Sequence, residues 1–145
     1  MRVVLDTNSV VSGLLWHGSP RSVLDLARSG QLSLFTSGVL LSELYDVLSR
    51  QKFAARLAAA GTTARELMLG YAALTTVVRA APVSGAVPED PDDDQVLGCA
   101  IASKADFIVS GDSHLLRLRE YEGVPIRSAG ELLELLPHNE EWSET

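Results

Sequence analysis

The chain has 145 residues, of which 46% are hydrophobic and 21% are charged, and its formal net charge is −7. This length is typical of one domain that buries its own core, and the composition is that of a soluble globular protein. The negative charge argues against passive electrostatic binding to nucleic acid. It does not exclude a nucleic-acid enzyme whose acidic groups hold metal ions. We expect a single domain over residues 1–137 and an acidic C-terminal tail over residues 138–145.

The N-terminal segment shows neither a secretion signal nor a membrane span. Met1 leads almost directly into an apolar strand that ends at Asp6, so no basic region, hydrophobic region or cleavage site precedes it. No apolar run is long enough to cross a bilayer. Cys99 is the only cysteine and lies in an apolar helical run, where we expect a small buried side chain. We therefore expect a cytoplasmic protein with no membrane association.

Five short apolar runs predict the strands of a buried sheet. The first run covers residues 3–5, and the others cover 32–35, 76–78, 107–109 and 124–126. Pro125 indicates that the last of them is an edge strand. Because helical segments separate the runs, the pattern favours βαβ units with right-handed crossovers. The expected fold is α/β, with three αβα layers around a central parallel sheet of four to five strands.

The segments between these runs carry helix signals. Ser19 and Pro20 are typical of an N-cap and a first helical position, and Thr36 or Ser37 can cap a helix over about residues 39–50. Ser128 can cap the last helix. Further helices are predicted over residues 53–60, from 63 to about 74, from 92 to about 103, and over 113–118.

Carboxylates follow two of the predicted strands. Asp6 comes directly after the first strand, and Asp112 comes shortly after the strand at 107–109. If these strands are neighbours where the strand order reverses, both carboxylates lie at the carboxyl edge of the sheet, where open α/β sheets bind ligands. Glu43 lies at the border of the apolar stripe of its helix and near the same edge, whereas Asp46 faces water.

Carboxylates that cluster repel one another and need a counter-charge. Oxygen ligands without a histidine pair or a cysteine favour Mg²⁺ or Mn²⁺ over zinc. A carboxylate cage around such ions is the usual apparatus for hydrolysing phosphodiester bonds. The chain has no glycine-rich phosphate loop, which argues against nucleotide-cofactor chemistry.

Four motifs, in their order along the chain, resemble the PIN-domain ribonucleases, especially the VapC-like toxins of bacterial toxin–antitoxin pairs. They are Val4-Leu5-Asp6-Thr7-Asn8, Ser42-Glu43-Leu44, residues 90–95 (Asp-Pro-Asp-Asp-Asp-Gln), and residues 105–112 (Ala-Asp-Phe-Ile-Val-Ser-Gly-Asp) followed by Leu115-Leu116. The resemblance implies a Mg²⁺- or Mn²⁺-dependent endoribonuclease. It also implies an RNA substrate, a cognate antitoxin protein and a homodimer.

The resemblance also assigns residues. It implies a catalytic, metal-holding set made of Asp6, Glu43, Asp94 and Asp112, with Asn8 and Ser110 as supporting polar residues. Within the acidic triplet the matching register points to Asp94. Asp92 and Asp93 are explained as acids at a helix start, favoured by the helix dipole by ~0.3–1 kcal/mol each, and one of them is a possible further ligand.

Each candidate also has a purely structural explanation. Asp6 and Asp112 can act as helix N-caps, and Glu43 can extend to water or pair with Arg50 or Lys52. The three histidines, at positions 17, 114 and 138, are expected to be surface or loop residues. Trp16 can stack on a base, although a capping or dimer-contact role is favoured.

Three functions remain open at this point, led by metal-dependent RNA cleavage. The second is an acidic-pocket phosphoacceptor or phosphotransferase on a doubly wound sheet. A haloacid-dehalogenase-type site needs a second aspartate where this chain has Asn8. A receiver-type site needs a late lysine, and the last one here, Lys104, precedes the strand before Asp112. The third is a catalytically silent PIN-like binding module.

Overall fold

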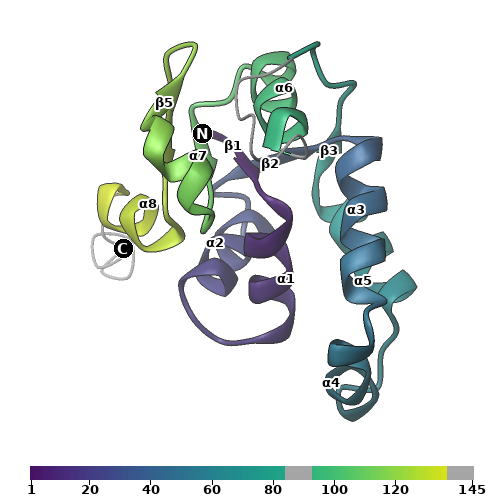
Figure 1. Ribbon diagram of the computed structural model, residues 1–145. Helices are drawn as coiled ribbons and strands as arrows, with labels where there is room; N and C mark the ends of the chain where they lie inside the picture. Colours follow the sequence, from purple (N-terminus) through teal and green to yellow (C-terminus); the bar gives the residue numbers. More distant parts are fainter. Residues whose placement is uncertain (84–92, 137–145) are drawn as a thin grey trace.

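A computed structural model describes residues 1–83 and 93–136 of the chain (Figure 1). The strands are β1 (Arg2–Leu5), β2 (Ser33–Thr36), β3 (Thr76–Val77), β4 (Phe107–Val109), β5 (Glu120–Tyr121) and β6 (Val124–Arg127). The helices are α1 (Thr7–Leu15), α2 (Ser19–Arg28), α3 (Gly38–Leu48), α4 (Ala54–Ala59), α5 (Ala64–Leu74), α6 (Asp93–Ser103), α7 (Ser113–Leu118) and α8 (Ala129–Leu135), with a 3-10 turn η1 (Gln51–Phe53). The predicted tail at 138–145 lies outside the described residues.

The sheet has the strand order β3-β2-β1-β4-β6-β5, and all its pairs are parallel except β5 with β6. Val4 of β1 is in register with Phe35 of β2 on one side and with Ile108 of β4 on the other. The sheet therefore extends from β1 to both sides, and β1 and β4 are adjacent, as the sequence predicts. The strand order reverses beside β1, which is where α/β sheets form their ligand sites.

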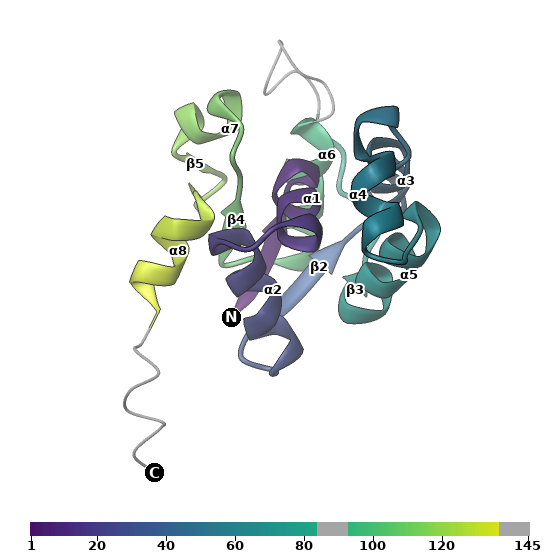
Figure 2. The ribbon, with the colours of Figure 1, turned by 90° about the horizontal axis from the view of Figure 1, so that it is seen from below.

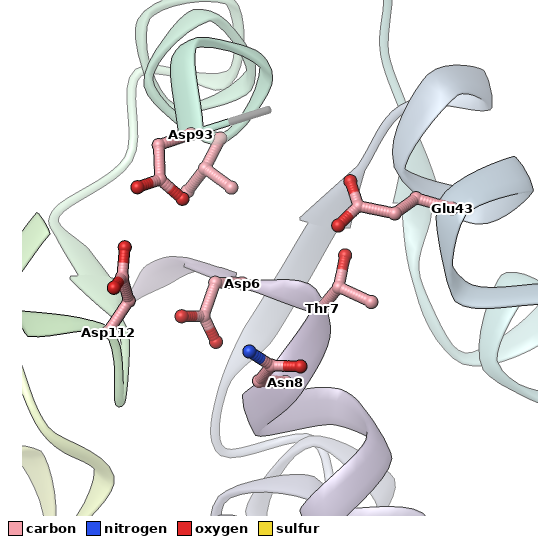
Figure 3. Close-up of a pocket in the computed structure, with 7 residues that line it drawn as sticks. Asp6, Thr7, Asn8, Glu43, Asp93 and Asp112 are labelled. Carbon is pink, nitrogen blue, oxygen red and sulfur yellow. The ribbon is translucent and has the colours of Figure 1, made fainter. Parts of the chain in front are cut away.

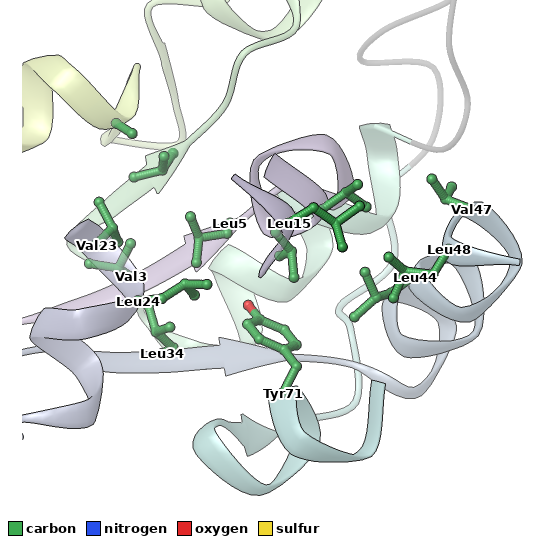
Figure 4. Packing of buried hydrophobic residues seen from close by; sticks show 14 of the residues in the cluster. Val3, Leu5, Leu15, Val23, Leu24, Leu34, Leu44, Val47, Leu48 and Tyr71 are labelled. Atoms are coloured by element: carbon green, nitrogen blue, oxygen red, sulfur yellow. The ribbon is translucent and has the colours of Figure 1, made fainter. Parts of the chain in front are cut away.

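Two helical layers cover the sheet. Val3 and Leu5 point into a core shared with α1, α2, α3, α5 and α8, which Figure 4 shows around Tyr71. Val4, between them, points to the opposite face and packs with α6 and α7. This alternation follows from the two-residue repeat of a strand. It confirms the predicted three-layer α/β architecture.

The two ends of the sheet carry different helices. Figures 1 and 2 show α3, α4 and α5 together on the side of the molecule that carries β3, and α7 and α8 together on the opposite side, which carries β5. Helices α1 and α2 pack closely at Gly13 of α1. A Cβ atom at this position would lie only 2.7 Å from Leu24 Cδ1 of α2, so a larger residue would force a shift. None of the helices in the described residues is long and apolar enough to span a membrane.

The helix ends largely follow the predicted capping residues. Ser37 and Ser128 accept hydrogen bonds from the backbone N–H groups of Leu40 and Glu131, and Glu131 completes a capping box at α8. The prediction for α2 was wrong by one residue, because Gly18 is the N-cap and Ser19 is already helical. Proline is tolerated at either of the first two positions, since neither N–H has a helical partner.

The predicted edge strand was also wrong. β6 lies between β4 and the two-residue strand β5, which the sequence pattern did not reveal, so β5 is the edge. Pro125 is tolerated because its neighbour on that side is very short: Glu120 is opposite Pro125, and Ile126 N still donates to Arg119 O at 2.9 Å. The missing N–H of Pro125 therefore costs little of the ladder.

Candidate active site

A small pocket of about 90 Å³ opens at the carboxyl edge of the sheet, where β1 and β4 end. Figure 3 shows Glu43 facing Asp93 and Asp112 across this pocket, with Asp6 between them. Four carboxyl groups thus meet from β1, α3, α6 and the end of β4. No lysine or arginine of the described residues lines the pocket, which is formed by Asp6, Thr7, Asn8, Glu43, Asp93, Val96 and Asp112.

Asp6 is the most firmly held of these groups. It is only 4% exposed and follows β1 as the N-cap of α1. Its Oδ1 accepts a hydrogen bond from Ser9 N at 2.8 Å, and its Oδ2 accepts from Ser110 Oγ at 2.6 Å and from Gly111 N at 3.3 Å. The predicted capping role is therefore real, and it fixes the carboxylate at the pocket floor rather than competing with a functional role.

Ser110 connects Asp6 to Asp112. Its side chain is buried, donates to Asp6 and accepts a hydrogen bond from Asp112 N at 2.9 Å. Because β4 pairs directly with β1, this short chain of hydrogen bonds crosses between the ends of two neighbouring strands. The predicted proximity of Asp6 and Asp112 is thus confirmed, and Ser110 is the residue that supports it.

Asp112 is both a helix cap and a pocket residue. Its Oδ1 accepts a hydrogen bond from His114 N at 3.3 Å at the start of α7. A side-chain hydrogen bond with Asp93 holds the pKa of Asp112 below its ordinary value, and the nearby His114 adds to this against the opposing effect of burial. The bond between the two carboxyls requires a proton on one of them. With both ionised, the buried Oδ2 of Asp112 has no hydrogen-bond donor among the described residues.

The first turn of α6 brings Asp93 rather than Asp94 to the pocket wall. Asp93 is 7% exposed and lines the pocket, whereas the next residue, Asp94, is half-buried and is not part of the lining. Successive helical side chains differ in direction by about 100°, so only one of the two can face Asp112 squarely. The assignment of Asp94 from family resemblance stays a prediction, and Asp92 lies outside the described residues.

His114 joins this group although the sequence spacing suggested a surface residue. Ligand atoms of Asp93, Asp112 and His114 all lie within 4.8 Å of one another. The signal was the placement of His114 in the first turn of a helix capped by Asp112, which turns it back toward the cap. Carboxylate oxygens with one imidazole, including the orphaned buried oxygen of Asp112, form a donor set that fits a divalent cation.

Glu43 and Asn8 complete the pocket rim. Glu43 lies in the second turn of α3 and is half-buried, while Asp46 one turn later is exposed, as the helical pattern predicted. Asn8 is exposed in the first turn of α1. In the core below the pocket, burial is the main cause that raises the pKa of Tyr71 above its ordinary value, and Cys99 and Asp6 add to it. Cys99 is fully buried, and burial raises its pKa to about 12.

Comparison with known protein families finds a match over more than half of the chain. The family model of the PIN domain matches residues 2–114, which include β1, α3, α6 and the Ser110–Asp112 turn. The chain therefore belongs to the PIN domain family. No curated protein matches it in sequence.

A solved structure shows the same fold at low sequence similarity. A chain in the crystal structure of VapBC2 from Rickettsia felis, bound to a DNA fragment from their promoter, matches with a TM-score of 0.58 and 16% identity. The match covers 88% of this chain and 98% of that chain. At this identity the similarity concerns the fold, and it extends over almost the whole of both chains.

Proposed function

We propose that this protein is a divalent-metal-dependent endoribonuclease and the toxin of a toxin–antitoxin pair. The observation that carries the proposal is the convergence of Asp6, Glu43, Asp93 and Asp112 on one small pocket without a basic side chain among the described residues. Like charges at such proximity need a cation, and PIN domains are generally metal-dependent nucleases. The buried Oδ2 of Asp112, which has no hydrogen-bond donor among the described residues once both aspartates are ionised, supports a metal ligand there.

In this proposal Asp6, Asp93 and Asp112 hold Mg²⁺ or Mn²⁺, and Asp94 remains a candidate from the family register. The bound cation would supply Lewis-acid chemistry, lowering the pKa of water and drawing charge from the phosphate oxygens. Ser110 and the N–H of Gly111 keep Asp6 oriented toward the pocket. Asp112 is oriented by Ser110 through its own N–H and by the start of α7.

Glu43 stands across the pocket from the aspartates, and its role differs from theirs (Figure 3). We assign its carboxylate one of two roles: it accepts a proton from the water that attacks phosphorus, or it holds a second ion. We assign Asn8, an exposed residue of the same pocket, to donate its amide N–H to a non-bridging phosphate oxygen. Water adds across the cleaved P–O bond, so one RNA fragment keeps the phosphate and the leaving oxygen of the other takes up a proton and becomes a hydroxyl group.

The partner part of the proposal comes from the fold neighbour, whose VapBC2 complex is bound to DNA from its promoter. We propose that the partner of this chain is a cognate antitoxin protein and that the compartment is the cytoplasm. Homodimerisation, which the family resemblance implied, stays a prediction.

The first experiment compares the wild type with Asp6→Asn. Asparagine is as good an N-cap as aspartate, so the Ser9 N–H keeps its acceptor. The amide nitrogen that replaces Oδ2 cannot accept from Ser110 Oγ and Gly111 N, but the variant also removes one negative charge from the acidic pocket, which offsets this loss. We expect the variant to lose at least about 100-fold in Mn²⁺-dependent cleavage of RNA, more than the 10- to 100-fold typical of groups that only orient ligands. Growth inhibition on expression should disappear in parallel, while the unfolding temperature in EDTA stays close to that of the wild type.

Metal binding is checked without relying on activity. At a Mn²⁺ concentration of 100 Kd the wild type should gain ~2.7 kcal/mol, which raises Tm by about 5–10 °C, and Asp6→Asn should gain little. A protein that binds Mn²⁺ but cuts no RNA would be a silent binding module. One that transfers a phosphoryl group to an aspartate would support the phosphoacceptor alternative. Either result rejects the nuclease proposal.

A further inference from the structure

The end of α1 opposite the pocket carries an exposed group of aromatic and basic side chains. Trp16, the C-cap of α1, is 43% exposed, and its ring lies edge-to-face with Phe53 at 6.0 Å between centroids. The guanidinium of Arg56 stands 5.6 Å from the centre of the Trp16 ring, and Lys52 stands 5.1 Å from that of Phe53. We refer to Trp16, Lys52, Phe53 and Arg56 as the Trp16 cluster.

Internal hydrogen bonds hold the cluster in place. Arg56 donates through Nε to Leu15 O at 3.0 Å and also through a terminal nitrogen to the same oxygen. This contact ties α4 to the last turn of α1 and stacks the guanidinium on the indole. An aromatic ring kept exposed and rigid in this way loses little entropy when a planar ligand stacks on it.

The chain segment that carries Lys52, Phe53 and Arg56 has a charge opposite in sign to that of the whole molecule. Between Asp46 and Glu66 the chain has four Lys or Arg residues and no Asp or Glu, although the net charge is −7. Lys52 and Arg56 are exposed, and neither takes part in a salt bridge within the described residues. A local positive surface on an acidic protein is suited to an anionic partner that the rest of the surface repels.

The exposed face of α1 connects the cluster to the acidic pocket. Asn8 lines the pocket, Ser12 follows one turn later, and Trp16 follows after four more residues, so the series runs along one side of the helix. The distance from Asn8 to Trp16 is about 12 Å at the helical rise per residue. Asn8 and Ser12 also border a second, larger cavity of about 370 Å³ whose lining is mostly serine and glycine. A few nucleotides of an extended strand span this length.

We propose that the Trp16 cluster binds single-stranded RNA on one side of the cleaved bond, with a base stacked on Trp16 and phosphates near Lys52 and Arg56. The inference rests on the proposed nuclease function and extends it by naming where the substrate strand runs. Stacking on an aromatic ring together with basic side chains is the usual means of binding single strands without sequence preference. The acidic pocket then receives the scissile phosphate through its cation, and the cluster supplies affinity.

The test measures binding of fluorescein-labelled single-stranded oligouridylate in EDTA, where metal-dependent cleavage does not consume the probe. Trp16→Leu should weaken binding about 5- to 150-fold, the usual cost of losing one stacked base. Lys52→Gln should weaken it several-fold and reduce the dependence of log K on log salt by about one phosphate contact. In a Trp142→Phe background Trp16 is the only tryptophan, and RNA should quench its fluorescence.

Lys104→Gln is the matched control, since it removes the same charge from an exposed lysine in the turn between α6 and β4, outside the Trp16 cluster. Equal affinity of Lys52→Gln and Lys104→Gln, with no quenching of Trp16, would overturn the inference even if Trp16→Leu folds poorly. If the wild type cleaves RNA with Mn²⁺ while these variants bind normally, the nuclease proposal stands and the strand path is wrong. If no RNA is bound or cut, both fail.

Discussion

The two ends of helix α1 are stabilised by side chains of opposite charge, as the helix dipole favours. At its N-terminus the cap is Asp6, a carboxylate that is almost completely buried. At its C-terminus the last carbonyl groups accept hydrogen bonds from two arginines: Arg21 donates to Gly13 O and Leu14 O, and Arg56 donates to Leu15 O. Negative charge at the start and positive charge at the end both favour the helix.

The two ends differ in what else the charge must satisfy. The guanidinium groups at the C-terminus donate to carbonyl groups, and that of Arg56 also stacks on Trp16, so the helix end is stabilised without a bound ion. The carboxylate at the N-terminus shares a small pocket with three more acids, and the dipole of one helix offsets only part of their repulsion. The comparison teaches that an acidic helix end calls for a bound cation when its negative charge exceeds what the protein itself neutralises.

The largest expected effect concerns Glu43, whose matched control lies on the same helix. Glu43→Gln keeps size and polarity but removes the charge that faces the aspartates, and we expect at least about a 100-fold loss of Mn²⁺-dependent RNA cleavage. Asp46→Asn removes a charge of the same sign from the exposed side of α3 and should leave the initial rate unchanged. Comparable rates for the two variants would show that the excess of charge at this end has no catalytic use.

Substitutions at the C-terminal end of α1 should change the stability of the protein rather than its activity. Arg21→Met keeps the aliphatic stem of a half-buried side chain but removes two hydrogen bonds to carbonyls, at 3.0 and 2.9 Å. We expect a loss of about 1.5–3 kcal/mol in urea unfolding, the range for a hydrogen bond to a charged group. Arg28→Met breaks an exposed pair with Asp25 and should cost at most about 1 kcal/mol. If the two variants are equally stable, the caps at this end contribute nothing specific.

The carboxylates at the N-terminal end of α1 could be predicted from the sequence, because Asp6 and Asp112 follow the ends of apolar strands. Apolar runs that stop at Asp6 and shortly before Asp112 predicted two adjacent strands, and the structure joins them through Ser110. The number of strands was harder to predict. β5 has only two residues, too few for a pattern of alternating burial, and the rule that assigns proline to edges depends on neighbours that the sequence does not show.

Two site residues depended on directions that spacing alone does not determine. Asp93 lines the pocket, whereas Asp94, turned by about 100° around the axis of α6, does not. His114 looked isolated because its partners come from another helix and from its own N-cap. The basic end was missed as a unit, since Trp16 and Arg56 are 40 positions apart and meet only when α4 packs on α1.

The smallest expected effect comes from a helix start that is acidic but exposed, the capping box of α8. Hydrogen bonds from Ser128, backbone N–H first, hold the pKa of Glu131 below its ordinary value. A lowered pKa means that the stabilisation is present above the pKa of the unfolded chain and is lost as pH falls through the folded value. Glu131→Gln keeps an acceptor for Ser128 N, so its stability should equal that of the wild type in acid and fall slightly below it at neutral pH. Urea midpoints measured from about pH 3 to about pH 7, a range that spans the ordinary pKa of glutamate, give this difference. Addition of Mn²⁺ should leave the stability difference between the wild type and Glu131→Gln unchanged, because Glu131 lies outside the acidic pocket. The same addition should change the stability of the wild type relative to Asp6→Asn at every pH where the pocket is ionised.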